Sequence, residues 1–155
     1  MAQALDFQVL VCEPRAAYRN TWKLVNTPVD ARMPDDLIRD SHVDSYTAVL
    51  AVSHDPRLDD LALMEALASD CFYVGVIGSR ASVPKRRERL ILLDVTPAQL
   101  TRLHSPAGLA IGSRTPPQIA VSVLAELVAQ QNAVQQVALA AHPHRSDEAM
   151  HPVDS

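Results

Sequence analysis

The chain has 155 residues, 48% of them hydrophobic and 21% charged, which is the composition of a folded domain of ordinary size and excludes a disordered or fibrous protein. Because 18 Asp and Glu outnumber 14 Lys and Arg, the net charge is −4, and a surface that is basic over its whole extent, as in a general nucleic-acid binder, is excluded. The two cysteines, Cys12 and Cys71, are too few for a disulfide framework and lack the spacing of a thiolate metal site, so we expect a reducing compartment and two small, buried thiols.

The N-terminal residues show no pattern of a targeting signal ahead of the first predicted elements. Residues 1–15 have no basic segment ahead of their apolar stretch, and no run approaches the roughly eighteen apolar residues of a membrane span, so we expect a cytoplasmic protein. The apolar run at residues 7–12 predicts a buried strand that ends before Glu13 and Pro14. A short strand near Val29 and a short helix from Pro34 are expected next.

The middle of the chain alternates strands with helices. Residues 47–52 (TAVLAV) and 72–77 (FYVGVI) are apolar runs typical of buried strands. Between them, apolar side chains recur at helical spacing as far as residue 68, with Asp55 as the expected N-cap and Pro56 at the first helical position. After the second run, Gly78, Ser79 and Arg80 lead into a basic helix that we expect to end at residue 93.

Three further elements are expected after this helix. Residues 96–102 predict a short helix capped by Thr96, residues 109–111 a short strand between glycines, and residues 119 to about 129 a long apolar helix. Thr115 and Gln118 have the spacing of a capping box for the last of these. This alternation predicts an α/β fold with a mostly parallel sheet and helices on both faces.

We divide the chain into a domain at residues 1–130 and, at residues 131–155, a helical extension with a disordered polar tail. The tail carries His142, His144 and His151, and because a disordered segment gives no fixed geometry we expect no metal site there.

In an open parallel sheet, ligands bind beyond the carboxyl ends of the strands. Glu13 lies at such an end, where a dinucleotide-binding fold places the carboxylate that accepts hydrogen bonds from ribose; the alternative is a solvated strand end. The glycine-rich fingerprint belongs about twenty residues upstream. Only twelve residues precede Glu13, so ordinary NAD binding is disfavoured.

Ser53, His54 and Asp55 follow the strand at residues 47–52. Their adjacency argues against a catalytic triad, because neighbours on a turn rarely align, and helix capping is the preferred role for Asp55. Ser53 can satisfy the amides of the turn. His54 is the member best suited to contact a phosphate or the edge of a pterin.

Gly78, Ser79 and Arg80 form the most informative turn. A glycine allows close approach of a ligand, a helix N-terminus attracts anions and Arg80 adds a bidentate donor, although a plain strand-to-helix turn explains the same residues. The basic run continues with Lys85, Arg86, Arg87 and Arg89. Such a run is usually a solvated face or a docking surface, and without interleaved aromatic residues it disfavours nucleic acid.

Three segments together resemble one family. They are residues 47–55 (TAVLAVSHD), 73–80 (YVGVIGSR) and 102–112 (RLHSPAGLAIG), the last followed by Thr115 and Pro116. Their order resembles the XdhC/CoxI family, the xanthine dehydrogenase accessory proteins, over about residues 9–129. Glu13-Pro14-Arg15 stands in place of the family's Asp-Pro-Arg.

The resemblance implies a Rossmann-like domain of a non-catalytic chaperone. Its cargo would be molybdenum cofactor, as molybdopterin or the cytosine dinucleotide form, passed to an apo-molybdoenzyme of the xanthine dehydrogenase or aldehyde oxidase type. A cysteine desulfurase would supply the terminal sulfur. Cofactor contact is carried over to residues that match family motifs at strand ends: His54, Asp55, Gly78, Ser79, Arg80, Gly112 and Thr115. Glu13 and Ser53 complete the expected set by their own strand-end positions, with no catalytic or metal-binding residue.

The chain departs from the family pattern at its start. The family's domain normally opens with a strand and a glycine-rich turn containing a Gly-His pair, after a separate domain, and this chain shows neither. If that strand normally lies inside the sheet, its loss leaves two unpaired edges. A partner strand, closure of the gap by neighbouring strands, or a shortened product with reduced function would each follow, and we favour self-association into a homo-oligomer.

Two other functions remain open on the sequence. The sheet pattern and Glu13 would suit an NAD(P)-binding oxidoreductase, which NADH binding would reveal. The basic helix that follows Arg80 would suit a docking module without a ligand, whose binding to an acidic partner would weaken with salt.

Overall fold

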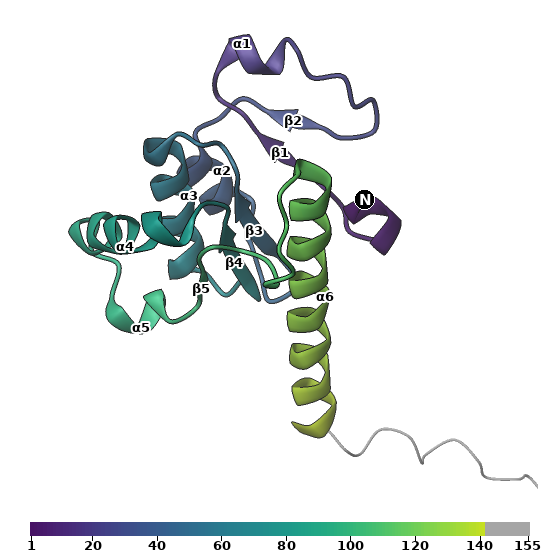
Figure 1. Ribbon diagram of the computed structural model, residues 1–155, viewed down its shortest axis with the longest axis vertical. Helices are drawn as coiled ribbons and strands as arrows, with labels where there is room; N and C mark the ends of the chain where they lie inside the picture. The colour runs from purple at the N-terminus through teal and green to yellow at the C-terminus, as the bar shows by residue number, and fades with distance from the viewer. Residues whose placement is uncertain (142–155) are drawn as a thin grey trace, which may run out of the picture.

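The computed structural model describes residues 1–141 and has an α/β architecture (Figure 1). β1 (Val11–Cys12) pairs with β2 (Val29–Asp30), and a larger sheet contains β3 (Ala48–Ala51), β4 (Tyr73–Val76) and β5 (Leu103–His104) in that order. Every pairing is parallel, which confirms the predicted type of sheet. The helices are α1 (Ala16–Arg19), α2 (Pro34–Asp40), α3 (Pro56–Ala68), α4 (Val83–Leu92), α5 (Pro97–Leu100) and α6 (Pro116–Ala141), with 3-10 turns η1 (Ala2–Leu5) and η2 (Arg80–Ser82).

β4 is the centre of the larger sheet, and its two faces carry different partners. Val74 and Val76 point into the main core, which they share with side chains of α3 and α4 such as Leu63, Leu67 and Leu90. Tyr73 points to the opposite face, where its hydroxyl reaches α6. Figure 1 shows α3 and α6 on opposite sides of the sheet, so helices cover both faces as predicted.

Local hydrogen bonds explain where two helices begin. Oδ1 of Asp55 accepts a 3.0 Å hydrogen bond from the Arg57 N–H, and Pro56 supplies a fixed φ at the first position of α3. Thr96 and Gln99 form a reciprocal capping box at α5. Both starts were predicted from these residues, because a cap depends on neighbours in the chain.

Two predicted strands differ in the structure. β1 contains only residues 11–12 of the run at 7–12. Residues 109–111 form no strand. The Leu109 N–H donates to the Ser122 carbonyl of α6 at 3.1 Å, so this segment is hydrogen-bonded to the helix and not to the sheet. The last strand of the sheet is instead β5, which is too short to show an apolar pattern.

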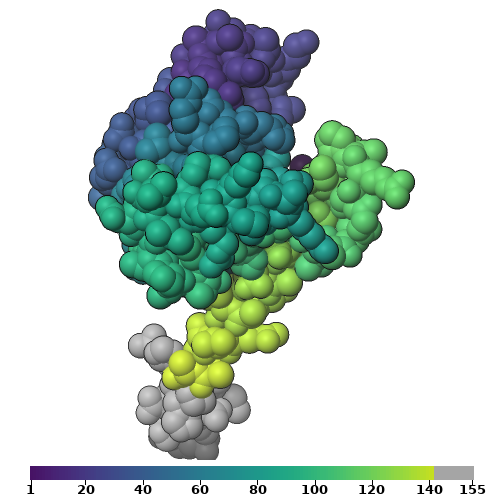
Figure 2. Space-filling view, turned by 60° about the vertical axis from the view of Figure 1, so that its left-hand side comes forward, coloured from purple at the N-terminus to yellow at the C-terminus, as the bar shows by residue number. Residues whose placement is uncertain are grey.

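Two helices also have bounds other than those expected for them. α4 starts at Val83, one 3-10 turn later than the glycine turn suggested. α6 runs to Ala141, so the helix expected at residues 119 to about 129 and the helical extension expected after residue 130 form one element, in which the Ala- and Gln-rich sequence favours helix. Figure 2 shows the end of α6 projecting from the body. The predicted polar tail with its three histidines lies outside the described residues.

The two sheets share no strand pairing within residues 1–141. β3 therefore has one unpaired edge, the feature on which the hypothesis of self-association depends. None of the helices in this part of the chain is both long and apolar enough to cross a bilayer.

Candidate functional site

A surface hollow of about 440 Å³ joins the end of β1 to the start of α3. Its volume falls within the range of small-molecule sites, roughly 300–1,000 Å³. The lining consists of charged side chains around an apolar floor: Pro14, Arg15, Met33, Asp55, Arg57, Leu58 and Leu61. A smaller hollow of about 190 Å³ between α2 and the end of α3 lies away from the predicted residues.

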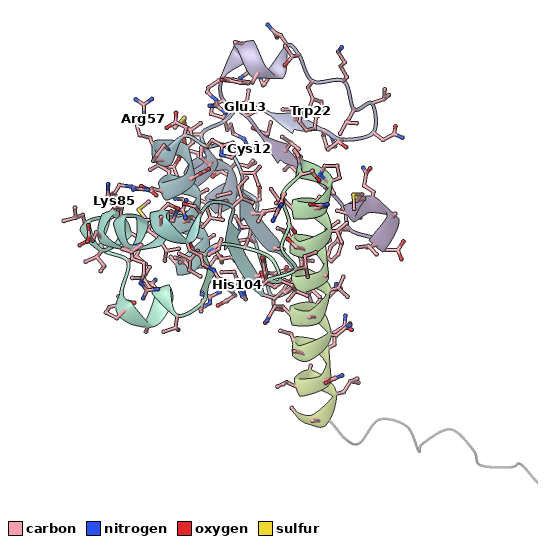
Figure 3. The ribbon with its side chains drawn as sticks, viewed as in Figure 1. Cys12, Glu13, Trp22, Arg57, Lys85 and His104 are labelled. Carbon is pink, nitrogen blue, oxygen red and sulfur yellow. The ribbon has the colours of Figure 1, made fainter. Side chains whose placement is uncertain are left out.

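Glu13 directly follows β1, as predicted (Figure 3). Its carboxylate is already engaged by Arg15. Arg15 donates to both of its oxygens at 2.7 Å, from Nε and Nη2, and its backbone N–H adds a third bond of 3.0 Å. These bonds hold the pKa of Glu13 below its ordinary value against the effect of burial. A ligand in the hollow therefore meets the Arg15 guanidinium, which stacks over the Tyr18 ring. The role of Glu13 as a ribose acceptor stays a prediction.

The turn after β3 uses two of its three predicted residues for its own hydrogen bonds. Ser53 Oγ donates to Oδ1 of Asp59 at 2.7 Å and accepts from the Asp55 N–H at 3.1 Å. Asp55 caps α3, as expected. His54 is exposed and has a left-handed backbone with φ of 59°, so the turn presents this ring to solvent.

The turn after β4 exposes Gly78, Ser79 and Arg80. Directly beneath it lies Arg86, which is only 8% exposed. Its Nη1 donates to Ser105 Oγ at 3.0 Å and its Nη2 donates to the Ile77 carbonyl at 3.4 Å. Arg86 was expected among several surface charges, although its position four residues before buried Leu90 places both on one helical face.

Gly112 and Thr115 lie in the exposed segment that leads into α6. Gly112 has φ of 74°, and no atom lies within 4 Å of the position that a Cβ would take. Gln118 Oε1 accepts from the N–H groups of Arg114 and Thr115 at 2.8 and 3.2 Å, which gives the Gln118 half of the predicted capping box.

The predicted residues thus fall into three groups. Asp55 joins Arg15 and Arg57 around the hollow, Gly78 lies against Arg86 beside Ser105, and Gly112 and Thr115 precede α6. Within residues 1–141 no side-chain hydrogen bond or ion pair links one group to another. The sequence did not single out Arg15, Arg86 or Ser105. Arg86 and Ser105 meet only through the fold, whereas Arg15 pairs locally with Glu13, two residues away.

A polar cluster of buried Tyr73 with half-buried His104 and Glu126 lies on the α6 face of the sheet. Glu126 Oε2 accepts from the Tyr73 hydroxyl and from the Gly108 N–H, both at 2.7 Å, and its Oε1 lies 3.2 Å from His104 Nδ1. The rings of Tyr73 and His104 stack with centroids 4.5 Å apart, and Figure 3 places His104 between the sheet and α6. Burial raises the pKa of Glu126, but the hydrogen bonds outweigh it, so the net shift is downward. Burial and this carboxylate raise the pKa of Tyr73, which stays a donor.

Comparison with known proteins finds three curated relatives with a similar sequence. A Bacillus subtilis protein named as a probable subunit of xanthine dehydrogenase is 26% identical over 130 residues, 83% of this chain and 37% of the relative. "Molybdenum cofactor insertion chaperone PaoD" of Escherichia coli is 30% identical over 87 residues, 56% of this chain and 27% of the relative. "Uncharacterized protein YqeB", also of Escherichia coli, is 30% identical over 93 residues, 60% of this chain and 16% of the relative.

A solved structure shares the fold. It is a crystal structure titled as a xanthine dehydrogenase from Bacillus halodurans, with a TM-score of 0.65 and 25% identity over 82% of this chain and 36% of that one. The chain thus spans well under half the length of these relatives. The family model described as the XdhC Rossmann domain matches residues 1–127. The resemblance seen in the sequence is therefore confirmed, and the chain belongs to the XdhC family through its Rossmann domain.

Proposed function

We propose that this chain binds molybdenum cofactor as cargo and assists its insertion into a molybdoenzyme of the xanthine dehydrogenase or aldehyde oxidase type. The hollow between β1 and α3 is the observation that carries the proposal, because it combines two arginines with an apolar floor at strand ends. The printed names of two relatives, a cofactor insertion chaperone and a probable subunit of xanthine dehydrogenase, point the same way.

The side chains around the hollow suit the two halves of such a cargo. Leu58 and Leu61 offer an apolar surface on which a flat pterin can pack. Arg15 and Arg57 are the donors for a phosphate, and His54 stands exposed beside the capping residue of α3. The proposed role is to bind and orient the cargo, with no catalytic step assigned to the chain.

The finer parts of the proposal concern cargo form and partners. Molybdopterin and its cytosine dinucleotide both carry the phosphate that the arginines would bind, so either form fits this scheme. We further propose a cysteine desulfurase as the partner that adds the terminal sulfur before the cofactor passes to the apo-enzyme. The unpaired edge of β3 supports self-association of the chain. A stable monomer in light scattering would contradict self-association.

A docking module without a ligand is the second candidate. Arg80, Lys85 and Arg87 are exposed on one segment and could meet an acidic partner. Arg86 and Arg89 weaken this alternative, because the first is buried and the second is paired with Asp60. NAD(P) binding is less favoured than the cargo or the docking function. The Glu13 carboxylate, which would accept hydrogen bonds from the ribose, already accepts them from Arg15.

Pterin content tests the proposal. The chain is purified from cells that make molybdenum cofactor, then denatured and oxidised, and the released fluorescent pterin is measured per chain. We expect near-stoichiometric pterin in the wild type, a large loss in Arg57→Ala, which removes a donor that lines the hollow, and no loss in Lys23→Ala, which removes an exposed charge outside it. Background pterin in a folded wild type would contradict the proposal, and saturable NADH binding there would favour the oxidoreductase.

A further inference from the structure

Four large apolar side chains are exposed between the start of α1 and β2. Tyr18 belongs to α1, and Trp22, Leu24 and Val25 follow in the segment that leads to β2. We call these four side chains the α1–β2 surface; their exposed fractions run from 40% for Trp22 to 96% for Val25. Figure 1 shows this part of the chain at one end of the molecule, away from α4 and α5, and Figure 3 labels Trp22 on it. Exposed apolar side chains that include Trp and Tyr are typical of protein interfaces.

Hydrogen bonds hold the backbone that carries this surface. Arg19 Nη1 donates to the Glu13 carbonyl at 2.9 Å, which fixes α1 to the end of β1. The Trp22 N–H donates to the Arg19 carbonyl at 3.0 Å. Further along, Gln3 Nε2 donates to the Asn26 carbonyl at 2.9 Å. A segment that is already held in place loses less entropy when it binds, so these contacts suit a docking surface.

The charge of the segment indicates the chemistry of its partner. Residues 14–29 contain three basic residues and no acid, although the whole chain has a net charge of −4. Arg15 pairs with Glu13, and Arg19 donates to a carbonyl group. Lys23 is exposed between the apolar side chains and has no ion pair within residues 1–141. Charge complementarity therefore favours a protein surface with acidic groups around an apolar area.

An anionic membrane is the other surface that Trp and Lys would suit. Basic clusters that recognise anionic lipids contain about four to eight Lys and Arg. Residues 14–29 contain three, and two of these already bind groups of the chain. A protein partner is therefore favoured over a membrane.

The α1–β2 surface adjoins the hollow between β1 and α3. Arg15 lines the hollow, and its guanidinium carbon lies 4.2 Å from the centre of the Tyr18 ring. A protein that contacts Tyr18 is thus beside the opening of the hollow. Because a protein that receives cargo has to approach the cargo site, the α1–β2 surface has the position that a receiver requires.

We propose that the α1–β2 surface docks the molybdoenzyme that receives the cargo, through an acidic and apolar surface of that enzyme. Tyr18 and Trp22 are the aromatic anchors, Leu24 and Val25 add apolar contact, and Lys23 meets an acid of the partner. For the identity of the partner, this inference rests on the proposed function. As a protein-docking surface, it rests on the exposure and charge of residues 14–29.

Binding to the apo form of the same organism's xanthine dehydrogenase-type enzyme tests the surface. The enzyme is made in cells without molybdenum cofactor, and its affinity for the purified chain is measured by calorimetry with the wild type, Leu24→Ser and Leu92→Ser. Leu92→Ser is the matched control, because Leu92 is 82% exposed on α4. We expect Leu24→Ser to weaken binding about tenfold or more, as for an interface anchor, and Leu92→Ser to change it by less than about threefold.

Trp22 provides a second readout at the surface itself. It is the sole tryptophan of the chain, so incorporated fluorotryptophan gives one fluorine resonance, and the enzyme carries no label. The shift of this resonance between light and heavy water measures the exposure of the indole. We expect that shift to fall when apo-enzyme is added and to stay unchanged with vesicles of phosphatidylglycerol and phosphatidylcholine.

Three results would overturn the docking surface: no binding of the enzyme by the wild type, equal losses in the two leucine variants, or a Trp22 resonance whose exposure does not change in the complex. A response to the vesicles and not to the enzyme would overturn it in favour of a membrane. Both leucines are exposed, so neither variant is expected to prevent folding, which circular dichroism checks.

Pterin content, measured on the same preparations, separates this inference from the proposed function. A wild type that carries pterin and does not bind the enzyme would support the cargo and reject the docking surface. Enzyme binding that depends on Leu24 in a chain without pterin would support the docking surface and reject the cargo.

Discussion

The hydroxyl of Tyr73 donates a 2.7 Å hydrogen bond to Oε2 of Glu126 and so joins the central strand to α6 across 53 residues of sequence. The same oxygen accepts from the Gly108 N–H at 2.7 Å. One carboxylate therefore links the sheet, the third turn of α6 and the segment between β5 and that helix. Because Gly112 and Thr115 belong to this segment, the position of two candidate contact residues depends on the cluster.

Tyr73→Phe removes only the hydroxyl of this contact. Tyr73 is 1% exposed and the acceptor is ionised, so we expect the free energy of unfolding to fall by about 1.5–3 kcal/mol. Urea unfolding measures the change. Tyr46→Phe is the control, because Tyr46 is 81% exposed and its loss should stay within about 0.5 kcal/mol. Equal losses in the two variants would show that the contact with Glu126 contributes little.

Glu126 also predicts how stability depends on pH. Its pKa in the folded protein lies below the ordinary value of 4.5, so its contribution is fully present above that value and is lost as the pH falls through the folded pKa. We expect the wild type to be more stable than Glu126→Gln near neutral pH and the difference to shrink in acid. Thermal unfolding across this range measures it. His104 faces the same carboxylate, so the comparison is repeated in a His104→Gln background. A constant difference between the wild type and Glu126→Gln would contradict the prediction.

Gly75 is required by the ring of Tyr73. A methyl group at Gly75 would lie 2.6 Å from Tyr73 Cε1, and the ring cannot move away because it stacks on His104 and is bonded to Glu126. We expect Gly75→Ala to lower the free energy of unfolding by about 1–3 kcal/mol. In a Tyr73→Val background the same change should cost much less, since the ring is gone. Additive losses in this double-mutant cycle would reject the steric cause.

The elements and residues predicted correctly are those that depend on their immediate neighbours. Runs of apolar residues showed β3 and β4, and Asp55 and Thr96 showed the helix starts, because each pattern is complete within a few residues. β5 was not predicted, because its two residues pair with β4 only in the folded chain and form no apolar pattern of their own.

The site was predicted less completely for the same reason. The strand ends pointed to Asp55 and Gly78. The sequence did not show that Arg15 donates hydrogen bonds to the Glu13 carboxylate, or that Arg86 is buried under the turn after β4. The burial of Arg86 depends on contacts between elements, whereas Glu13 and Arg15 are two residues apart and their pairing is local. Helical spacing from Leu90 was the one available signal for Arg86, and it competes with the usual exposure of arginine.

Asp60 and Arg89 connect α3 to α4, and with it the helix that carries Arg86. Nη2 of Arg89 donates to Asp60 Oδ1 at 3.1 Å, Nε donates to the other oxygen, and the carboxylate side chain is only 8% exposed. Arg89→Met would leave that carboxylate buried without its cation, so we expect a loss of about 2–4 kcal/mol in the free energy of unfolding. Arg57→Met is the control: Arg57 also pairs with an aspartate, Asp55, but its side chain is 89% exposed, and its loss should stay below about 1 kcal/mol. Urea unfolding measures the free energy of unfolding of both variants. Similar losses would mean that burial does not determine how much the ion pair of Asp60 and Arg89 stabilises the fold.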